Sequence, residues 1–311
     1  MTTDHENTSI SVNRDSRPAF STPPHFDHVF VTVSVETQKL INECDFLVKE
    51  QFGRFSLRVS ESSMLGSYMP TRVYGKNNLI EIFPNKFGGN EKFVEHCAGI
   101  ILSFDHPGEM AQARNELQLA GLKFSAEVVD RIMPNGSGGR DRTPWYDFTR
   151  PDMGSASPIA VFLHEIQPGF LAQVGANVGP GGRVDRGARF DASLGRPHTS
   201  NQVMENILGV TVRLRRDRIE RASAILTTLG CEVTAVESGI SVRGIDGEII
   251  FVADDSPREG TMELKFAITR PDPGRRFDFG TESSLVLSPA GPEDYSAVWS
   301  FRPHRNSVKL P

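Results

Sequence analysis

The sequence has 311 residues, of which 38% are apolar and 23% charged, with a formal net charge of −5. This length and composition are typical of a globular chain with room for two domains. The acidic balance argues against a nucleic-acid-binding protein, which usually presents a basic surface. No apolar run approaches the roughly 20 residues of a membrane-spanning helix, and the polar N-terminus lacks the apolar core of a signal peptide. We therefore expect a cytoplasmic protein with neither nucleic acid nor membrane as a partner.

Residues 1–24 are rich in Ser, Thr, Asn, Asp and Pro. Such a segment buries too little apolar area to offset the entropy of ordering it, so the composition predicts a disordered tail. The three cysteines, Cys44, Cys97 and Cys231, are too widely spaced for a disulfide framework or a Cys-x-x-Cys metal site. We interpret them as small residues of the core.

The first apolar segment, residues 26–33, alternates between two faces as a β-strand does. Val29, Val31 and Val33 form an aliphatic stripe on one face, and His28 and Phe30 lie on the other. A helix is predicted for residues 35–52, ending at a glycine. Three further strands are predicted at residues 54–59, 68–74 and 78–83, with glycines in the turns. The pattern therefore predicts a βαβββ module.

A second copy of this order follows. A strand is predicted at residues 98–104, a helix at 109–120 closed by a glycine, and strands at 123–130 and 158–166. The polar, glycine-rich residues 134–157 interrupt this copy. We expect the two copies to form one domain over residues 25–170, followed by a Gly/Arg-rich linker over residues 171–204 that contains a mobile loop.

The second half of the chain, residues 205–311, predicts a further βαβββ unit and an incomplete one. The helix over residues 217–229 has a good apolar stripe and ends at a glycine. Strands are predicted on both sides of it, then at residues 262–269 and 284–288, with no clear helix between the last two. We expect a second, degenerate domain here.

Asp27-His28-Val29 at the start of an apolar strand, followed by a helix and three strands with Glu81 in the last of them, resembles a glyoxalase-type module of the vicinal oxygen chelate superfamily. Within it, the nearest likeness is an uncharacterised glyoxalase-like bacterial group. The resemblance covers residues 25–170 well and residues 205–270 loosely. It implies an α+β fold in which paired βαβββ modules form a cupped mixed sheet with helices outside, plus a degenerate second glyoxalase-like domain.

The resemblance also implies a divalent metal ion (Fe, Mn, Zn or Ni) inside the cup. His28 and Glu81 stand at ligand positions, and aligning the last strands of the two copies adds Glu165. The adjacent His164 is the alternative, because imidazole binds transition metals more tightly than a carboxylate does. Gly99 stands where the second module usually carries a histidine. Without a metal, His28 would be a structural histidine and Glu81 would form a salt bridge with Arg72.

Two groups of residues are candidates for contacting a ligand. Tyr68 and Arg72 are four residues apart on the predicted middle strand, an even spacing, so they share a face. Trp145 and Tyr146, in the interruption of the second copy, form either a wall of a pocket or an anchor of that loop in the core.

Three functions follow from this pattern. The leading prediction is a metal-dependent enzyme with lyase- or isomerase-like chemistry, in which the metal chelates vicinal oxygens of a small oxygenated metabolite. Glu165 or Glu81 would then transfer protons as a catalytic carboxylate. The alternative is a non-catalytic protein that binds or sequesters a small molecule with the same fold. The third is a structural or regulatory dimer, and a homodimer is compatible with each of them.

Overall fold

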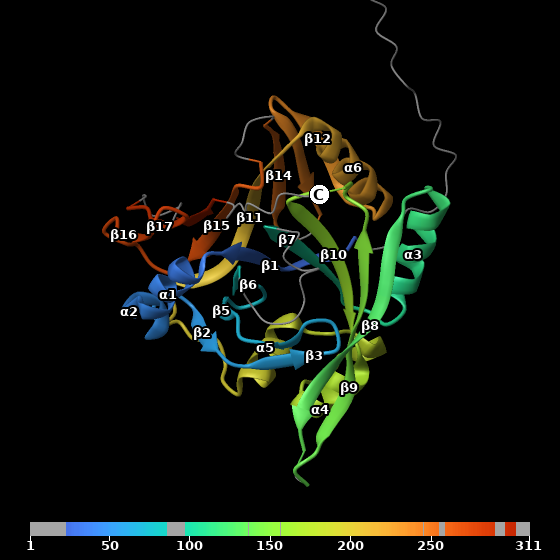
Figure 1. Cartoon of the computed structure of the whole chain (residues 1–311), viewed down its shortest axis with the longest axis horizontal. Coiled ribbons are helices and arrows are strands. Elements are labelled where there is room, and N and C mark those ends of the chain that lie inside the picture. Colours follow the sequence, from blue (N-terminus) through green and yellow to red (C-terminus); the bar gives the residue numbers. More distant parts are fainter. Residues whose placement is uncertain are drawn as a thin grey trace, which may run out of the picture.

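The computed structural model describes residues 23–85, 97–135, 137–155, 157–244, 246–254, 259–289 and 296–302. The predicted disordered tail lies outside the described residues up to residue 22. In the described part, the strands form a ten-stranded sheet and an eight-stranded sheet (Figure 1). Among the helices described, none combines the length and the apolar character needed to cross a membrane.

The first sheet and its helices are built from the first half of the chain. Their elements are β1 (His25–Val33), α1 (Val35–Glu43), α2 (Asp45–Val48), β2 (Arg54–Leu57), β3 (Ser60–Ser62), β4 (Gly66–Tyr68), β5 (Thr71–Tyr74), β6 (Leu79–Pro84), β7 (Ala98–Phe104), α3 (Glu109–Leu119), β8 (Phe124–Pro134), β9 (Arg140–Pro151) and β10 (Ile159–Ile166).

These elements form two copies of one βαβββ arrangement, as predicted. In the first copy β6 returns parallel to β1, and in the second β10 returns parallel to β7. The two copies join through the antiparallel pair of β1 and β7, so the sheet order is β2-β5-β6-β1-β7-β10-β9-β8-β3-β4. Strands β2 and β3 are close in sequence but stand near opposite ends of this order. The sheet must therefore curve into the predicted cup.

Three local differences from the predicted elements have simple causes. The single helix predicted over residues 35–52 breaks at Cys44, which has extended backbone angles. The strand predicted over residues 68–74 is interrupted at Pro70, which lacks an N–H for the ladder. The polar interruption of the second copy holds β9, which pairs with β8 along its length. Its exposed charged residues, such as Arg140 and Arg142, conceal the alternation expected of a strand.

From His28 onward, the faces of β1 lie as the alternation predicts. Val29, Val31 and Val33 are buried in the main hydrophobic core. His28 and Phe30 face the other way and line a cavity in the cup. The aliphatic stripe of β1 thus packs toward the helices, and the opposite face is available to a ligand.

The second sheet contains a complete third module and a fourth module without a helix. Its elements are β11 (Met204–Leu214), α6 (Arg216–Thr228), β12 (Glu232–Val236), β13 (Gly239–Arg243), β14 (Glu248–Ala253), β15 (Met262–Ile268), β16 (Arg276–Phe279), β17 (Ser283–Leu287) and β18 (Ser296–Phe301). Strand β14 is parallel to β11, as in the first two modules, whereas β18 is antiparallel to β15. The degenerate character predicted for this half is confirmed.

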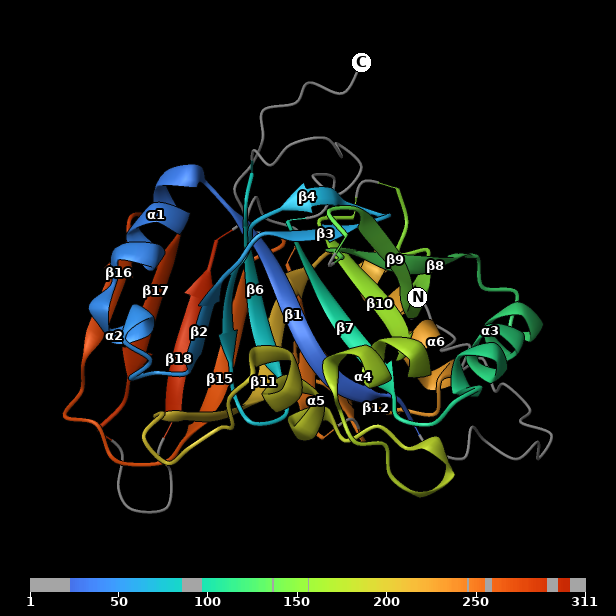
Figure 2. The same ribbon diagram turned by 90° about the horizontal axis from the view of Figure 1, so that it is seen from below.

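Helices of the first module occupy the place of the missing helix. The ring of Phe46 on α2 stacks on Phe277 of β16, with centroids 4.8 Å apart. Phe52 packs edge-on against Phe266 and Trp299 of the second sheet. Figure 2 shows α1 and α2 beside β16 and β17 at one flank and α3 near α6 at the other. Buried residues of both sheets form one continuous core.

The segment predicted as a linker with a mobile loop contains helices, which corrects that part of the prediction. These helices are α4 (Pro168–Val174), the 3-10 turn η2 (Pro180–Gly182) and α5 (Arg186–Leu194). The side chain of Asp185 caps α5 at its start, and Gly195 ends it in the left-handed conformation. Buried Arg54 of β2 forms an ion pair with Asp191 and fastens α5 to the first sheet. The division of the chain into domains around residues 171–204 stays a prediction.

Candidate functional site

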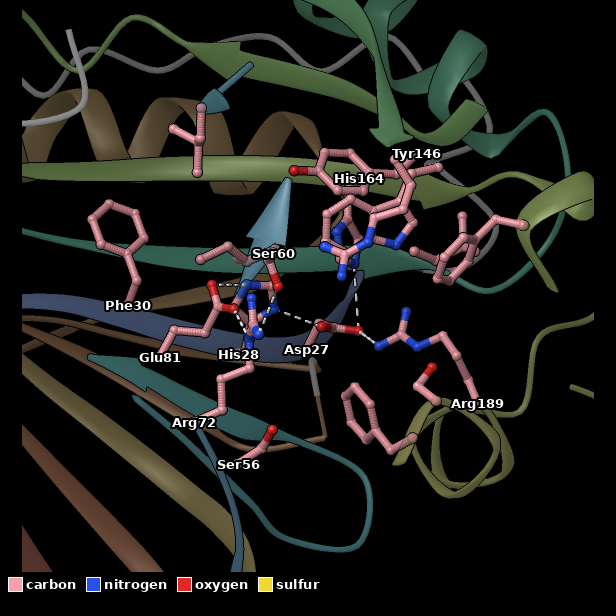
Figure 3. A pocket seen from close by; sticks show the side chains of 18 of the residues that line it. Asp27, His28, Phe30, Ser56, Ser60, Arg72, Glu81, Tyr146, His164 and Arg189 are labelled. Carbon is pink, nitrogen blue, oxygen red and sulfur yellow. Dashed lines mark hydrogen bonds and ion pairs between the residues drawn. The ribbon is translucent and has the colours of Figure 1, made fainter. Parts of the chain in front are cut away.

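A cavity of about 390 Å³ lies inside the cup of the first sheet. Aromatic side chains from β1, β6, β9 and β10 form much of its wall, and α4 and α5 contribute to its rim. Polar groups cluster at its floor (Figure 3). The aromatic lining residues are Phe30, Tyr68, Tyr74, Phe83, Trp145, Tyr146, Phe148, Phe162, Phe170 and Phe190.

Asp27 is the centre of the polar floor. The pairing of β1 with β7 shifts between Phe26 and His28, and this irregularity places Asp27 in the cavity lining beside His28. Its carboxylate accepts a hydrogen bond from His28 Nδ1 at 2.6 Å and another from Arg189 of α5. His164 Nε2 lies 3.4 Å from the same carboxylate (Figure 3).

The ionisation of this cluster follows from its surroundings. Burial alone would raise the pKa of Asp27, but Arg189 and His164 outweigh burial and hold that pKa well below its ordinary value. Asp27 is therefore a carboxylate, and His28 donates from Nδ1. Burial lowers the pKa of His164, so this imidazole is neutral at neutral pH.

A second charged pair lies beside the first. Glu81 of β6 forms an ion pair with Arg72 of β5, whose guanidinium also donates to Ser60 at 3.1 Å. His28 Nε2 lies 3.8 Å from Glu81. Burial would raise the pKa of Glu81, yet the charge of Arg72 reverses the effect and lowers it. Glu81 is thus a carboxylate held between a fixed cation and the imidazole of His28.

Most of the predicted site residues meet in this cavity. Its lining includes His28, Glu81, His164, Tyr68, Arg72, Trp145 and Tyr146. Both interpretations of the Trp145 segment hold, since Trp145 and Tyr146 line the cavity and Trp145 also packs against Phe170 of α4. Arg72 forms the salt bridge with Glu81 that was the alternative to a metal.

Glu165 is the exception, and its assignment as a ligand or catalytic carboxylate is corrected. Strand β10 presents His164 to the cavity, so its neighbour Glu165 faces the helix side. There the carboxylate accepts hydrogen bonds from the backbone N–H groups of Gly108 and Met110, at 3.0 and 2.9 Å. These groups belong to the start of α3 and have no partner within the helix. The role of Glu165 is to cap that helix.

The side chains present do not fit a resident divalent metal. Both carboxylates at the floor are already neutralised by guanidinium groups, Glu81 by Arg72 and Asp27 by Arg189. Among the described residues, no three His, Cys, Asp or Glu side chains are grouped so that they could hold an ion. A side chain at position 99 would begin 2.1 Å from Cε1 of Phe30, closer than van der Waals contact. Phe30 thus fills the space beside the position where a second-module histidine was expected.

Asp27 and Arg189 are two charged residues of the cavity that sequence reasoning missed. Strict alternation assigns Asp27 to the face opposite His28, and only the shift in strand pairing brings it to the cavity. Arg189 lies on α5, in the segment interpreted as a linker. The sequence does carry a signal for this helix, because Asp185 and Gly195 stand where a cap and a stop belong.

The paired βαβββ modules around one cavity define the α+β class that the resemblance implied. The chain belongs to the family of unknown function DUF5829, whose model matches residues 26–301. No curated protein matches the chain in sequence.

Solved structures are similar to this chain at low identity. A hypothetical protein from Staphylococcus aureus is 11% identical, with a TM-score of 0.48, over 74% of this chain and 86% of that one. A catechol 2,3-dioxygenase is 11% identical, with a TM-score of 0.43, over 91% and 90%. A Mn(II)-bound glyoxalase from Novosphingobium aromaticivorans is 11% identical, with a TM-score of 0.39, over 75% and 62%.

Proposed function

We propose that this protein binds a small, flat molecule in the aromatic cavity of its first sheet. The cavity itself carries the proposal, since its volume of about 390 Å³ falls within the roughly 300–1,000 Å³ of small-molecule sites. Its wall is largely aromatic, and a cluster of hydrogen-bonded polar groups lies at its floor, as in sites that orient a ligand. This is the binding function weighed as an alternative from the sequence.

A neutral fluorescent probe tests this proposal. N-phenyl-1-naphthylamine should bind one site per chain and become more fluorescent in the apolar cavity. Ser193 of α5 is exposed and lines the rim, so Ser193→Trp should obstruct entry and weaken probe binding about tenfold or more, a difference of ~1.4 kcal/mol. Gln173→Trp, on an exposed position of α4 outside the lining, is the matched control and should bind normally. Equal binding by both variants would contradict the proposal.

A second candidate is proton-transfer catalysis by His28. The hydrogen bond from Nδ1 to Asp27 directs the lone pair of Nε2 away from Asp27, on the side where Glu81 lies 3.8 Å away. A histidine oriented in this way can act as a general base. It would accept a proton from a carbon beside a carbonyl group and return one to the same carbon. This chemistry uses His28 in place of the predicted Glu165.

Deuterium exchange tests this second candidate. The methyl protons of 2-acetylnaphthalene in D₂O should exchange faster with the wild type than with His28→Gln, as followed by NMR. Both proteins should bind the naphthylamine probe equally. If the two proteins bind the probe equally and exchange deuterium at the same rate, His28 is not a catalytic base and only the binding function remains.

The finer prediction of metal-dependent lyase or isomerase chemistry requires about one divalent ion per chain, and elemental analysis of purified protein tests it.

A further inference from the structure

The charges that line the cavity do not balance. Two carboxylates, Asp27 and Glu81, face four guanidinium groups. Arg189 pairs with Asp27 and Arg72 pairs with Glu81, so each of these charges is compensated. Arg58 and Arg131 complete the count, and neither forms an ion pair with any carboxylate in the described ranges. The cavity therefore carries an excess of two positive charges before any ligand enters.

Arg131 is the better placed of these two cations. It lies on β8, half-buried, and its guanidinium carbon stands 5.0 Å above the ring of Trp145. Its charge also acts on the floor of the cavity, where it assists Arg72 in lowering the pKa of Glu81 against the effect of burial. This cation–π contact uses the charge of the guanidinium and leaves its N–H donors for a ligand. Arg58 is exposed, so its charge is screened by solvent.

We propose that the ligand is an aromatic anion, whose ring packs against the aromatic wall and whose carboxylate binds Arg131. A planar carboxylate matches the two parallel donors of a guanidinium edge. Trp145 holds this edge in place, so little side-chain freedom is lost on binding. The proposal rests on the proposed binding function and adds the charge and chemical class of the ligand.

A pair of probes of equal shape separates charge from fit. The 2-naphthoate ion and neutral 2-naphthamide should both quench the fluorescence of Trp145, one of two tryptophans in the chain. Trp299 is fully buried in the core shared with the second sheet, and Trp145→Phe should abolish the signal. We expect 2-naphthoate to bind about tenfold more tightly than 2-naphthamide, the order of effect of one charge-assisted hydrogen-bonded pair.

Arg131→Met should remove this preference, because it should weaken the binding of 2-naphthoate far more than that of 2-naphthamide. Arg142→Met is the matched control, because Arg142 is exposed on the neighbouring strand β9 and lies outside the lining. It removes the same net charge and should keep the preference. Binding of N-phenyl-1-naphthylamine by Arg131→Met shows that its cavity is intact.

The outcomes distinguish this inference from the proposed function. Equal affinities of the two probes, or a preference that survives in Arg131→Met, would overturn anion recognition and leave the binding cavity standing. Loss of the preference in Arg142→Met as well would assign it to overall charge and would also overturn the inference. Binding of none of the three aromatic probes would overturn both proposals.

Discussion

The variant Arg72→Met should unfold about 3–5 kcal/mol more easily than the wild type, the usual cost of removing one partner of a buried ion pair. Arg72 is 7% exposed, and its guanidinium is the cation that faces the carboxylate of Glu81. Methionine has a similar length and leaves Glu81 in a largely buried place without compensation. Urea unfolding, followed by far-ultraviolet circular dichroism, measures the change.

The double variant Arg72→Met/Glu81→Met is its control. Replacing both charges with apolar groups of similar size is often close to neutral, so most of the lost stability should return. If the double variant is as unstable as Arg72→Met, then the loss comes from packing and hydrogen bonds of Arg72, such as the one to Ser60, and not from the unpaired carboxylate.

The variant Val31→Asp should fail to accumulate as soluble protein. Val31 is 2% exposed and lies in the core between the first sheet and its helices. A carboxylate there would be buried without a partner, at a cost of several kcal/mol, comparable to the roughly 5–15 kcal/mol that stabilises a whole domain. Expression at low temperature, followed by separation of the soluble fraction, measures the outcome.

His28→Ala is the control on the other face of the same strand. His28 borders a cavity, so its removal enlarges a space that is already present and should leave the melting temperature within a few degrees of the wild type. Equal damage by the two substitutions would mean that both faces of β1 are structural.

The fold was predictable because strand alternation survives wherever one face is buried. In β1 the aliphatic stripe and the residues opposite it were separated correctly, and the family resemblance joined Glu81 to His28 in one cavity. Strand β9 was not predicted because its exposed charged residues weaken the alternation. The βαβββ order can therefore be predicted from the sequence, whereas a single strand with solvent-exposed faces can be missed.

The site was only half predictable, because its contacts depend on register and on a distant segment. Aligning the last strands of the two copies assigned Glu165 to the position of Glu81, but strand β10 presents His164 to the cavity instead. The similarity of the two strand sequences therefore led to the wrong residue, and the pairing of β10 with its neighbours was needed to assign its faces. The ion pair between Arg189 and Asp27 could not be predicted from the sequence, because it depends on how α5 packs against the first sheet.

The stacking of Phe46 on Phe277 has a consequence for how the protein is made. Phe46 and its neighbour Phe52 leave the ribosome long before Phe277, Phe266 and Trp299 are synthesised, so their rings at first have no partners to pack against. Until then the nascent chain exposes apolar surface, the condition under which chains aggregate or engage chaperones. We expect the first module to complete its packing only after the strands of the second sheet have been synthesised, so that these later strands control when the cup can bind a ligand.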